Sequence, residues 1–521
     1  MPPWSIQARP PTGVTRAAVK RDADVIAALL EDAAHVPGGR AAGVVVAASE
    51  ADIAHAMAGA PAVLAIGAQS SLTGGATPRG ELLISTVGLN RIHEIGPDRV
   101  RVGVGVPLAA LETALETAGR AYPPAPTFMG AFVGGTIATN AAGAATFKYG
   151  TTRDWIRALT VVLPTGDVLD IERGGVRAHP DGYFDIVLRD RTVRVPLPQY
   201  HLPDVPKVSA GYFAAPGMDL IDLFIGSEGT LGVITEATLQ LLPSRRAECL
   251  AFVPVRGRAA ALALVGHLRD TARATWAGGS PDDLDVSAIE HMDRRCLDLL
   301  REDGADRIAG VRWPDDAEMA LLITIEVPPG VDAEHVVERL AGVLDAAGVV
   351  DDVEVAAPGD RARAAQLRAL REAVPAGVNQ RVGRAKTSDP RIEKTAADMI
   401  VPFDRLHELM DRYDAAFAQR ALDAAVWGHI SDGNLHPNVI PRAFADVESG
   451  KAAMLELGRM VIAMGGSPLA EHGVGRNPIK QQLLRELYGE AGIEEMRRVK
   501  RALDPEWKLA PGVLFDSRGE I

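Results

Sequence analysis

The chain contains only two cysteines, Cys249 and Cys296, among 521 residues. Two thiols cannot build a disulfide framework, and they cannot supply the four ligands of an iron–sulfur cluster. A basic block is also missing, and the formal net charge is −13. This balance argues against nucleic acid or an anionic membrane as the main partner. Because two cysteines are too few, any iron–sulfur cluster that works with this chain must belong to another molecule.

Long apolar runs are absent as well. No stretch approaches the ~20 apolar residues of a membrane span. The N-terminal segment, "MPPWSIQARPPTGVTRAAVKRDADVIAALL", has charges where a signal peptide has its apolar core. These features predict a cytoplasmic protein with no membrane span.

The length predicts roughly two to four domains, and 52 glycines and 35 prolines predict many tight turns. Up to Pro243, short apolar strands alternate with helices such as the one predicted over residues 22–34. Residues 171–215 are polar and indicate a long excursion. After Pro243 the apolar spacing changes to that of long amphipathic helices, predicted over 361–379, 402–422 and 451–464, so we place a domain boundary near residue 244.

Three glycine-rich tracts precede that boundary, at residues 65–78 ("AIGAQSSLTGGATP"), 133–150 and 226–235. The first tract can direct backbone N–H groups and hydroxyls toward an anion, as a phosphate-binding nest does. It lacks the glycine spacing of the Rossmann dinucleotide fingerprint. Each tract alone also fits a tight turn in a β-rich domain. Small residues throughout a tract indicate a backbone that lies against something flat or bulky.

The segment "VWGHISDGNLHPNVIP", residues 426–441, contains a pair of histidines around an Asp-Gly step. Asp-Gly between β-favouring residues predicts a two-residue hairpin turn at Asp432-Gly433. That register makes His429 and His436 direct cross-strand partners, with Cβ atoms roughly 5 Å apart, within chelating distance of one metal ion. A hairpin in which the two histidines only pack or form hydrogen bonds remains the alternative, and a third ligand would decide between them.

The ordered set of motifs resembles a known family. "AIGAQSSLTGG", "VGGTIATNAAG" with "FKYGTTRDW", "LPTGDVL" and "FIGSEGTLGVITEATLQLLP" resemble the FAD-binding domain of the vanillyl-alcohol oxidase/para-cresol methylhydroxylase superfamily. "LREAVPAGVN", "GHISDGNLHPNV", "EHGVGRNPIK" and "DPEWKLAPGVLF" are similar to its branch of FAD-dependent D-lactate, D-2-hydroxyglutarate and glycolate dehydrogenases. The resemblance covers about residues 35 to 515.

The resemblance implies an α+β fold, with a two-subdomain FAD-binding domain, an α+β cap domain over the isoalloxazine, and a C-terminal segment that returns to the flavin. We assign residues 1–34 to an N-terminal extension and 35–243 to the FAD-binding domain. Residues 244–460 form the predicted cap, and 461–521 complete the active site.

The resemblance also implies non-covalent FAD. Relatives often have an Arg-Gly-x-Gly-Thr sequence in the first loop, whereas this chain has Ile66-Gly67-Ala68-Gln69-Ser70, which removes a cation and keeps the small donors. The cofactor-binding residues predicted by this comparison are Gly67, Ala68, Gln69, Ser70, Ser71, Gly74, Gly134, Gly135, Asn140, Gly143, Glu228, Gly232, Val233 and Asn434.

In the resembling enzymes a glutamate joins the hairpin histidines on a divalent metal, and the next residue, a histidine, is the base. Here these residues are Glu471 and His472. Two histidines and one carboxylate leave coordination positions open, as in catalytic zinc sites. A solvated charged pair at a helix end is the alternative reading of Glu471-His472. The expected metal is zinc, which lowers the pKa of bound water from ~16 to ~7 and would act similarly on a substrate hydroxyl.

Arg371 matches the family arginine that would bind the substrate carboxylate, and Asn438 matches a substrate-contacting position; a helix-surface arginine is the alternative for Arg371. The hydroxyglutarate branch has a threonine and a lysine where this chain has Pro375 and Ala396. A small monocarboxylate, D-lactate or glycolate, is therefore favoured as the substrate. D-2-hydroxyglutarate remains an alternative if Lys394 or Lys386 takes the place of the missing lysine. The electron acceptor would be external, a quinone, a cytochrome or an electron-transfer flavoprotein, and a homodimer stays open.

Two other readings remain. Alkyl-dihydroxyacetonephosphate synthases of the same superfamily use FAD without net oxidation, but they have a His-rich "HHG" segment where this chain has Glu471-His472-Gly473. The glutamate favours the dehydrogenase. The third reading is a flavin-binding subunit that acts mainly as part of a larger redox complex.

Overall fold

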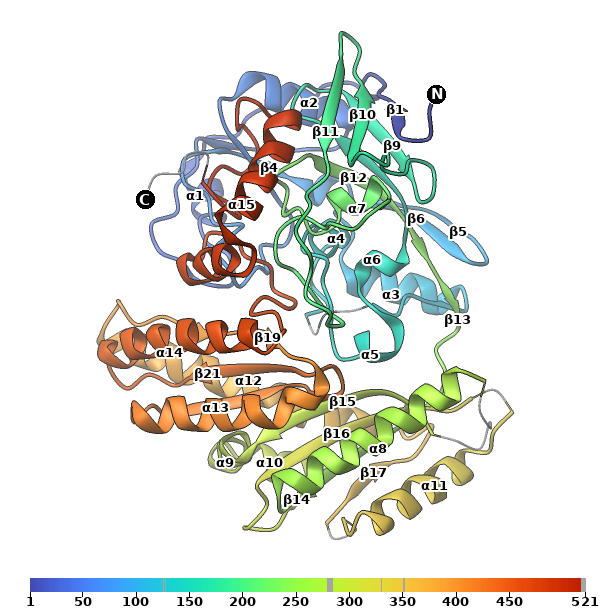
Figure 1. Cartoon of the computed structure of the whole chain (residues 1–521), viewed down its shortest axis with the longest axis vertical. Helices are drawn as coiled ribbons and strands as arrows, with labels where there is room; N and C mark the ends of the chain where they lie inside the picture. The colour runs from blue at the N-terminus through green and yellow to red at the C-terminus, as the bar shows by residue number, and fades with distance from the viewer. Residues whose placement is uncertain (125, 127, 279–283, 329, 350–351, 517–521) are drawn as a thin grey trace.

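The structure is a computed structural model that describes every residue except 125, 127, 279–283, 329, 350–351 and 517–521. Figure 1 shows two halves, with both ends of the chain in the upper half. The upper half contains the residues before Pro243 and the segment after residue 463. The lower half contains the residues between them. The predicted α+β fold is confirmed.

Among the described residues, the upper half contains four sheets of three, five, three and two strands. The first is parallel, since β2 and β3 both pair with β4 and helix α2 forms the crossover between them. The second is an antiparallel sheet of order β5-β6-β12-β8-β9. The parallel sheet consists of β2 (Gly43–Val46), β3 (Val63–Ile66) and β4 (Leu82–Ser85), and the five-stranded sheet of β5 (Ile92–Ile95), β6 (Arg99–Gly103), β8 (Ile156–Val162), β9 (Val168–Glu172) and β12 (Val233–Gln240). The third sheet consists of β1 (Ser5–Gln7), β10 (Tyr183–Val187) and β11 (Thr192–Pro196), and the fourth of β7 (Arg120–Ala121) and β13 (Leu242–Pro243).

Mostly short helices accompany these sheets. They are α1 (Ala23–Ala27), α2 (Glu50–Gly59), η1 (Thr86–Gly88), α3 (Leu108–Thr117), α4 (Val133–Ala138), α5 (Thr146–Tyr149), α6 (Thr152–Trp155), α7 (Ile221–Phe224) and α15 (Pro478–Leu503). The helix predicted over 22–34 is limited to α1. The predicted excursion at 171–215 is not wholly irregular, because β10 and β11 form a hairpin there, and β1 pairs with β10.

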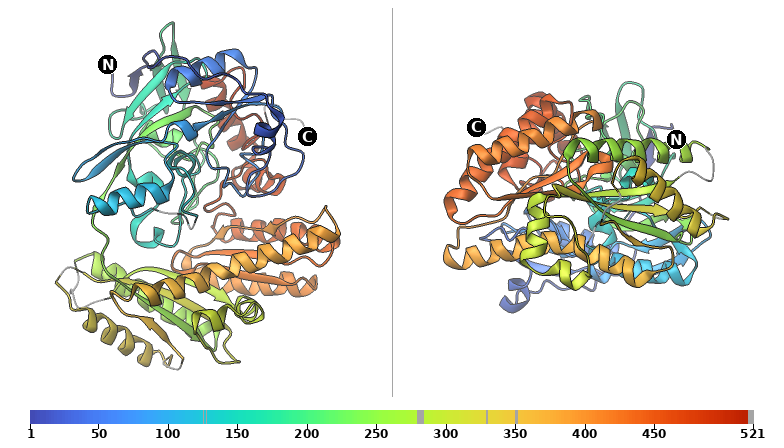
Figure 2. Two further views of the ribbon diagram at one scale, coloured as in Figure 1. Left: turned by 180° about the vertical axis from the view of Figure 1, so that it is seen from behind. Right: turned by 90° about the horizontal axis from the view of Figure 1, so that it is seen from below.

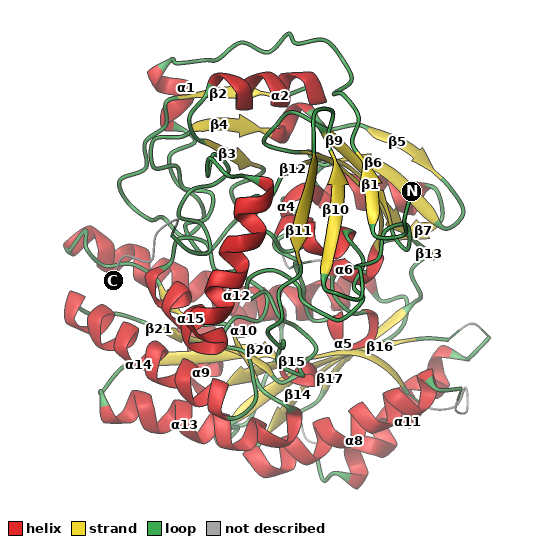
Figure 3. Cartoon of the chain, turned by 45° about the horizontal axis from the view of Figure 1, so that its top comes forward, coloured by secondary structure: helices red, strands yellow, loops and turns green. Residues whose placement is uncertain are grey.

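The lower half is one large antiparallel sheet that lies between helices (Figures 2 and 3). Its sheet has the order β17-β14-β16-β15-β20-β21-β18, and β19 also pairs with β21. The elements are β14 (Glu248–Val255), β15 (Asp285–Asp293), β16 (Met319–Glu326), β17 (Glu354–Ala356), β18 (Thr395–Ala396), β19 (Met399–Ile400), β20 (Ala424–His429) and β21 (Asn434–Val439), with helices α8 (Arg258–Trp276), α9 (Arg294–Glu302), α10 (Ala305–Ala309), α11 (Ala333–Ala346), α12 (Arg361–Ser388), η2 (Phe403–Arg405), α13 (Leu406–Gln419), η3 (Ile430–Asp432) and α14 (Phe444–Ala463).

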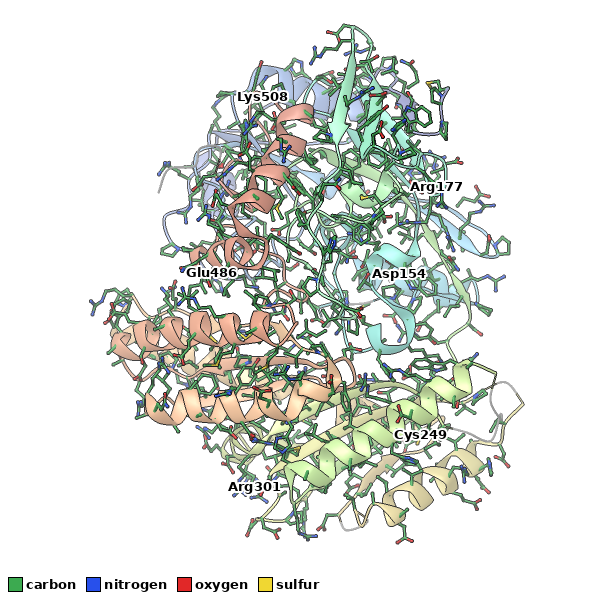
Figure 4. The ribbon with its side chains drawn as sticks, in the orientation of Figure 1. Asp154, Arg177, Cys249, Arg301, Glu486 and Lys508 are labelled. Carbon is green, nitrogen blue, oxygen red and sulfur yellow. The ribbon has the colours of Figure 1, made fainter. Side chains whose placement is uncertain are left out.

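Both faces of this sheet are buried. Along β14, Cys249 and Ala251 face a core shared with α8, α11, α13 and α14, while Leu250 and Phe252 face a second core shared with α9, α10 and α12. This two-residue period is the alternation expected of a strand. The free cysteines lie in different cores, since Cys296 belongs to the second. Figure 4 shows Cys249 in this half and Glu486 and Lys508 in the other.

After α14 the chain returns to the upper half. α15 packs near β11, and beyond it the chain runs parallel to β3, where Val63 N donates to Lys508 O and Ala510 N donates to Val63 O, both at 2.8 Å. The segment around Glu471 lies on this return path and so brings its side chains between the halves. None of the described helices has the length and apolar character needed to cross a membrane.

Candidate active site between the two halves

The hairpin that carries the two histidines differs in register from the prediction. His429 is opposite Asn434 rather than opposite His436, so the histidines are diagonal neighbours. The predicted turn is wrong because Ile430–Asp432 forms a 3-10 turn, and only Gly433 has a positive φ, 84°. A primed two-residue turn with Asp-Gly needs positive φ at both positions. The rings still lie on one face, with centroids 5.4 Å apart.

Glu471 completes a cluster with the two histidines. His429 Nε2 lies 3.5 Å from Glu471 Oε1, and His436 Nε2 lies 3.9 Å from Glu471 Oε2. All three side chains are buried, and one ligand atom from each lies within 4.8 Å of the others. Two imidazole nitrogens and a carboxylate oxygen that converge in this way fit a divalent transition metal such as zinc. The structure thus brings Glu471 together with the two histidines, and the binding of a metal by these three residues stays a prediction.

Each histidine has a carboxylate on the side away from Glu471. His429 Nδ1 lies 3.0 Å from Glu290 Oε2, and His436 Nδ1 lies 3.3 Å from Asp398 Oδ1, although neither approach has ideal hydrogen-bond alignment. Metal-binding histidines commonly place a carboxylate at the second nitrogen, which fixes the tautomer and the ring orientation. This arrangement leaves both Nε2 atoms to face Glu471, as a metal site requires.

A buried lysine contacts the same glutamate. Lys207 Nζ lies 2.5 Å from Glu471 Oε1 and 2.7 Å from Asp432 Oδ2, and it donates to Gly143 O at 3.1 Å. Burial opposes the charge on Glu471, but Lys207 and His429 hold the pKa of this carboxylate well below its usual range. Burial likewise opposes protonation of Lys207, and the two carboxylates raise its pKa to about 12. The cluster thus contains a carboxylate that stays ionised.

His472 lies beside the cluster and lines the adjoining cavity. Its ring is stacked with that of His436 at 5.5 Å, and its side chain retains 33% exposure. Burial lowers the pKa of His472 to about 4, despite the nearby carboxylate of Asp398. The imidazole is therefore neutral near pH 7 and has a nitrogen able to accept a proton.

A cavity of about 880 Å³ opens between the halves next to this cluster. All three metal candidates, His472 and the predicted substrate residues Arg371 and Asn438 line it. The predicted cofactor residues that line it are Gly67, Ala68, Gln69, Ser70, Ser71, Gly134, Gly135, Glu228, Gly232 and Val233. The three glycine tracts therefore converge on one cavity.

Four predicted cofactor residues do not line the described cavity: Gly74, Asn140, Gly143 and Asn434. Gly74 has a positive φ and shapes the first loop, and Asn140 Oδ1 accepts from Arg153 N at 2.9 Å. The carbonyl of Gly143 accepts from Lys207. Asn434 Nδ2 donates to Asp398 Oδ1 at 3.1 Å and to Met399 O at 3.0 Å.

Gly135 tests whether the wall suits a flat cofactor. It lies in α4 on the cavity wall, and an added Cβ would meet no atom within 4 Å. Its neighbour Gly134 is needed for a different reason, because an added Cβ would lie 2.7 Å from Val104 Cβ. A bare backbone at Gly135 lets a planar group approach the helix closely. The wall therefore fits an isoalloxazine.

Glu228 connects this wall to the returning C-terminal segment. Its carboxylate accepts from Val474 N and Gly475 N, both at 2.8 Å. Burial raises the pKa of Glu228 to about 7, against the lowering effect of these two hydrogen bonds. Glu228 itself has a positive φ of 51°. These contacts hold the turn after His472 against the FAD-binding half.

The end of the cavity nearest the hairpin is cationic. Arg371 is buried and pairs with Glu290 at 3.1 Å, while its Nε has no hydrogen-bond partner among the described residues. Lys394 also lines this end without an acidic partner in the described chain, and burial lowers its pKa to about 8. Asn438 Oδ1 and Thr395 Oγ1 are buried without partners there as well. Such unmet groups suit a polar, anionic ligand.

Sequence reasoning did not single out Glu290, Asp398 or Lys207. Glu290 is an acidic residue within the apolar strand β15, and Lys207 lies in the segment read only as an excursion. A charge inside a buried strand is itself a signal, because burying it unpaired is costly. Their partners, however, come from distant parts of the chain, so spacing alone does not reveal them.

Two family models match the chain. An FAD binding domain matches residues 41–172, and the C-terminal domain of FAD linked oxidases matches residues 256–514. The mitochondrial D-2-hydroxyglutarate dehydrogenase of Bos taurus is 30% identical over 459 residues, covering 85% of this chain and 71% of that protein.

Other curated relatives have similar identity. A D-lactate dehydrogenase of Anaerostipes hadrus is 27% identical, covering 86% of this chain and 82% of its own, and the glycolate oxidase subunit GlcD of Bacillus subtilis is 29% identical, covering 87% and 84%. Among solved structures, the 4-ethylphenol oxidase of Gulosibacter chungangensis has a TM-score of 0.64 at 16% identity, covering 95% and 94%, and an alkyldihydroxyacetonephosphate synthase has 0.59 at 16%, covering 90% and 75%. At these identities the solved structures show the fold alone.

Proposed function

Because this chain belongs to the FAD-linked oxidase family, we propose that it oxidises a D-2-hydroxy acid to the 2-oxo acid with FAD and a divalent metal, and passes the electrons to an external acceptor. The observation that carries the proposal is the convergence of His429, His436 and Glu471 beside His472 at the wall of the flavin-sized cavity. Relatives named for D-lactate, glycolate and D-2-hydroxyglutarate support the substrate class.

The three ligand candidates would hold the metal through two Nε2 atoms and one carboxylate oxygen. When bound, a zinc ion supplies a positive charge that favours loss of the proton from a hydroxyl group coordinated to it. Glu290 and Asp398 keep the Nδ1 sides of the rings occupied. The buried setting and the ionised Glu471 favour retention of a cation at this place.

His472 is the residue that would accept the hydroxyl proton. It is neutral at pH 7, lines the cavity and lies next to the metal ligands, so its free ring nitrogen can take a proton from a group bound there. FAD, when bound, supplies the hydride acceptor. The glycine tracts that line the cavity would hold the cofactor.

Arg371 would bind the substrate carboxylate. Its unpaired Nε and its place on the cavity wall suit this role, and its contact with Glu290 fixes the guanidinium beside the metal cluster. A guanidinium binds a carboxylate through two parallel hydrogen bonds, which orients the acid as well as retaining it.

The choice of acid depends on Lys394. The sequence favours D-lactate or glycolate, since Pro375 and Ala396 lack the groups that bind a second carboxylate. Lys394 nevertheless places a cation without an acidic partner on the cavity wall. A dicarboxylate such as D-2-hydroxyglutarate is therefore also a candidate. The Lys394→Met variant distinguishes the two: with a dicarboxylate substrate KM rises by about tenfold or more, and with a monocarboxylate it changes little.

Steady-state oxidation with an artificial electron acceptor tests the proposal. Purified enzyme is assayed with D-lactate, L-lactate, glycolate and D-2-hydroxyglutarate, with and without zinc. A preference for one D-acid that depends on metal supports the proposal. FAD-loaded, metal-loaded enzyme that oxidises none of these acids would contradict it.

A further inference from the structure

Asp398 contacts more of the site than the single ligand histidine, His436, beside which the proposed chemistry places it. It lies between the short strands β18 and β19 and is completely buried. Its backbone forms a bridge with Leu469, and its carbonyl accepts from Ala470 N at 3.2 Å. Asp398 thus joins the sheet of the cap to the returning C-terminal segment at the point where Glu471 begins.

Its two carboxylate oxygens have separate sets of partners. Oδ1 lies 3.3 Å from His436 Nδ1 and accepts from Asn434 Nδ2 at 3.1 Å. Oδ2 accepts from Glu471 N at 2.7 Å and from His472 N at 2.8 Å, and it lies 3.4 Å from His472 Nδ1. One oxygen therefore faces a metal-ligand candidate, and the other faces the base and the backbone of the third ligand.

Among the described residues, no lysine or arginine contacts this carboxylate. Its partners are the side-chain amide of Asn434, two backbone N–H groups and two imidazole rings. A role limited to bonding two backbone N–H groups would not need a charge, because an amide oxygen can accept both. The carboxylate also faces two imidazole nitrogens, one at each oxygen. An amide has only one oxygen and could not accept at both positions.

We propose that Asp398 is a positioning residue that orients the metal ligand His436 and the base His472 together. This inference rests on the proposed function, and it extends it by coupling the two histidines through one side chain. With Nδ1 of His436 turned toward Oδ1, its Nε2 faces Glu471. With Nδ1 of His472 turned toward Oδ2, the other nitrogen of that ring stays available to substrate.

The Asp398→Asn variant tests the coupling, and Glu290→Gln is its matched control. Glu290 contacts the other metal-ligand histidine, His429, and no hydrogen bond or ion pair among the described residues joins it to His472. Both variants should bind zinc about 10–100-fold more weakly in competition with a chelator, the usual effect of losing such a partner. At saturating zinc, Glu290→Gln should be less impaired in kcat than Asp398→Asn, and its KM should rise because Glu290 also contacts Arg371. Asp398→Asn should remain at least tenfold below wild type in kcat, because His472 is still misoriented.

Flavin absorbance and thermal unfolding show whether each variant is folded and loaded. A folded Asp398→Asn protein with wild-type zinc affinity, or one whose kcat recovers fully with zinc, would overturn the double role. If this variant does not fold, Asn434→Ala provides the test: it keeps the carboxylate, loses the amide that holds Oδ1, and should weaken zinc binding severalfold. Unchanged zinc affinity would then overturn the inference.

The failure of this inference differs from failure of the proposed function. Wild-type protein that binds no divalent metal, or that oxidises no hydroxy acid, would remove the proposed function. If the wild-type protein does both, but the variants lose zinc affinity and kcat only as far as they lose folded protein, then the proposed role of Asp398 alone is wrong.

Discussion

At the scale of single residues, the chemistry depends on polar groups that are buried in pairs. The local motifs in the sequence revealed His429, His436, Glu471 and His472, because these lie in two short segments. Glu290, Asp398 and Lys207 could not be assigned in that way, since each meets its partner side chains across at least 36 residues of chain. Short sequence motifs therefore identify the candidate metal-binding residues, whereas the residues that orient them are found only in the folded structure.

His472 is predicted to act as the base. Replacing it by Asn should lower kcat by about 10²–10⁴-fold, because general base catalysis contributes an effect of this size. FAD content and zinc affinity should remain near those of wild type, since His472 is not one of the three ligand candidates. Steady-state kinetics with the preferred acid, together with metal analysis, checks this. A variant with unchanged kcat would contradict the assignment.

Lys207 is predicted to stabilise the buried cluster. Lys207→Met leaves Asp432 and Glu471 without their shared cation, and breaking a buried ion pair in this way costs about 3–5 kcal/mol of unfolding free energy. Removing Asp432 as well, in a Lys207→Met/Asp432→Asn double variant, should restore part of that loss. Denaturant unfolding measures both. Equal losses in the single and double variants would show that the pairing is not the cause.

At the scale of elements, the sequence predicted which helices and strands exist better than it predicted where they begin and end. α12 continues to Ser388, past the predicted end at 379, and includes Pro375. α14 begins at Phe444, before the predicted start at 451. Packing against the sheet extends both helices beyond their strongest apolar repeat. A hairpin forms as predicted, but its register differs from the prediction because Ile430–Asp432 forms a 3-10 turn. In that turn Asp432 pairs with Lys207.

α4 should bind the cofactor through its bare backbone. Gly135→Leu places a side chain in space that is empty in the structure, so FAD content should fall by tenfold or more while the fold is retained. Gly383→Leu is the control, because Gly383 is also a helical glycine without neighbouring atoms but lies on the exposed side of α12, away from the cavity. The ratio of flavin to protein absorbance measures the effect. Equal flavin loss in both variants would contradict this role.

At the scale of the whole molecule, the active site exists only because the C-terminal segment returns between the halves. The resemblance to known flavoproteins predicted this return, and the order of elements along the chain did not. Glu228 from the FAD-binding half holds the turn at Val474 and Gly475. Lys148 of α5 links the halves elsewhere, with Nζ 2.8 Å from Asp285 and 2.7 Å from Glu326.

Glu228 should make this junction sensitive to pH. Its pKa of about 7 in the folded protein lies above the ordinary value of 4.5, so the folded state retains the proton more strongly than the unfolded chain. The resulting stabilisation is complete below pH 4.5 and is lost as the pH rises through 7, by roughly 3 kcal/mol. Glu228→Gln should remove this part of the pH dependence. Urea unfolding of both proteins from pH 5 to 8 checks it, and identical curves would contradict it.

The central claim is that bound flavin receives electrons from a D-2-hydroxy acid only when the metal cluster is filled. The most direct measurement is anaerobic titration of the purified protein with D-lactate, glycolate and D-2-hydroxyglutarate while the flavin absorbance is recorded, before and after chelation. We predict bleaching by one of these acids, loss of bleaching on chelation, and its return with added zinc. An oxidised flavin that none of the acids bleaches, or that bleaches equally without metal, would contradict the account.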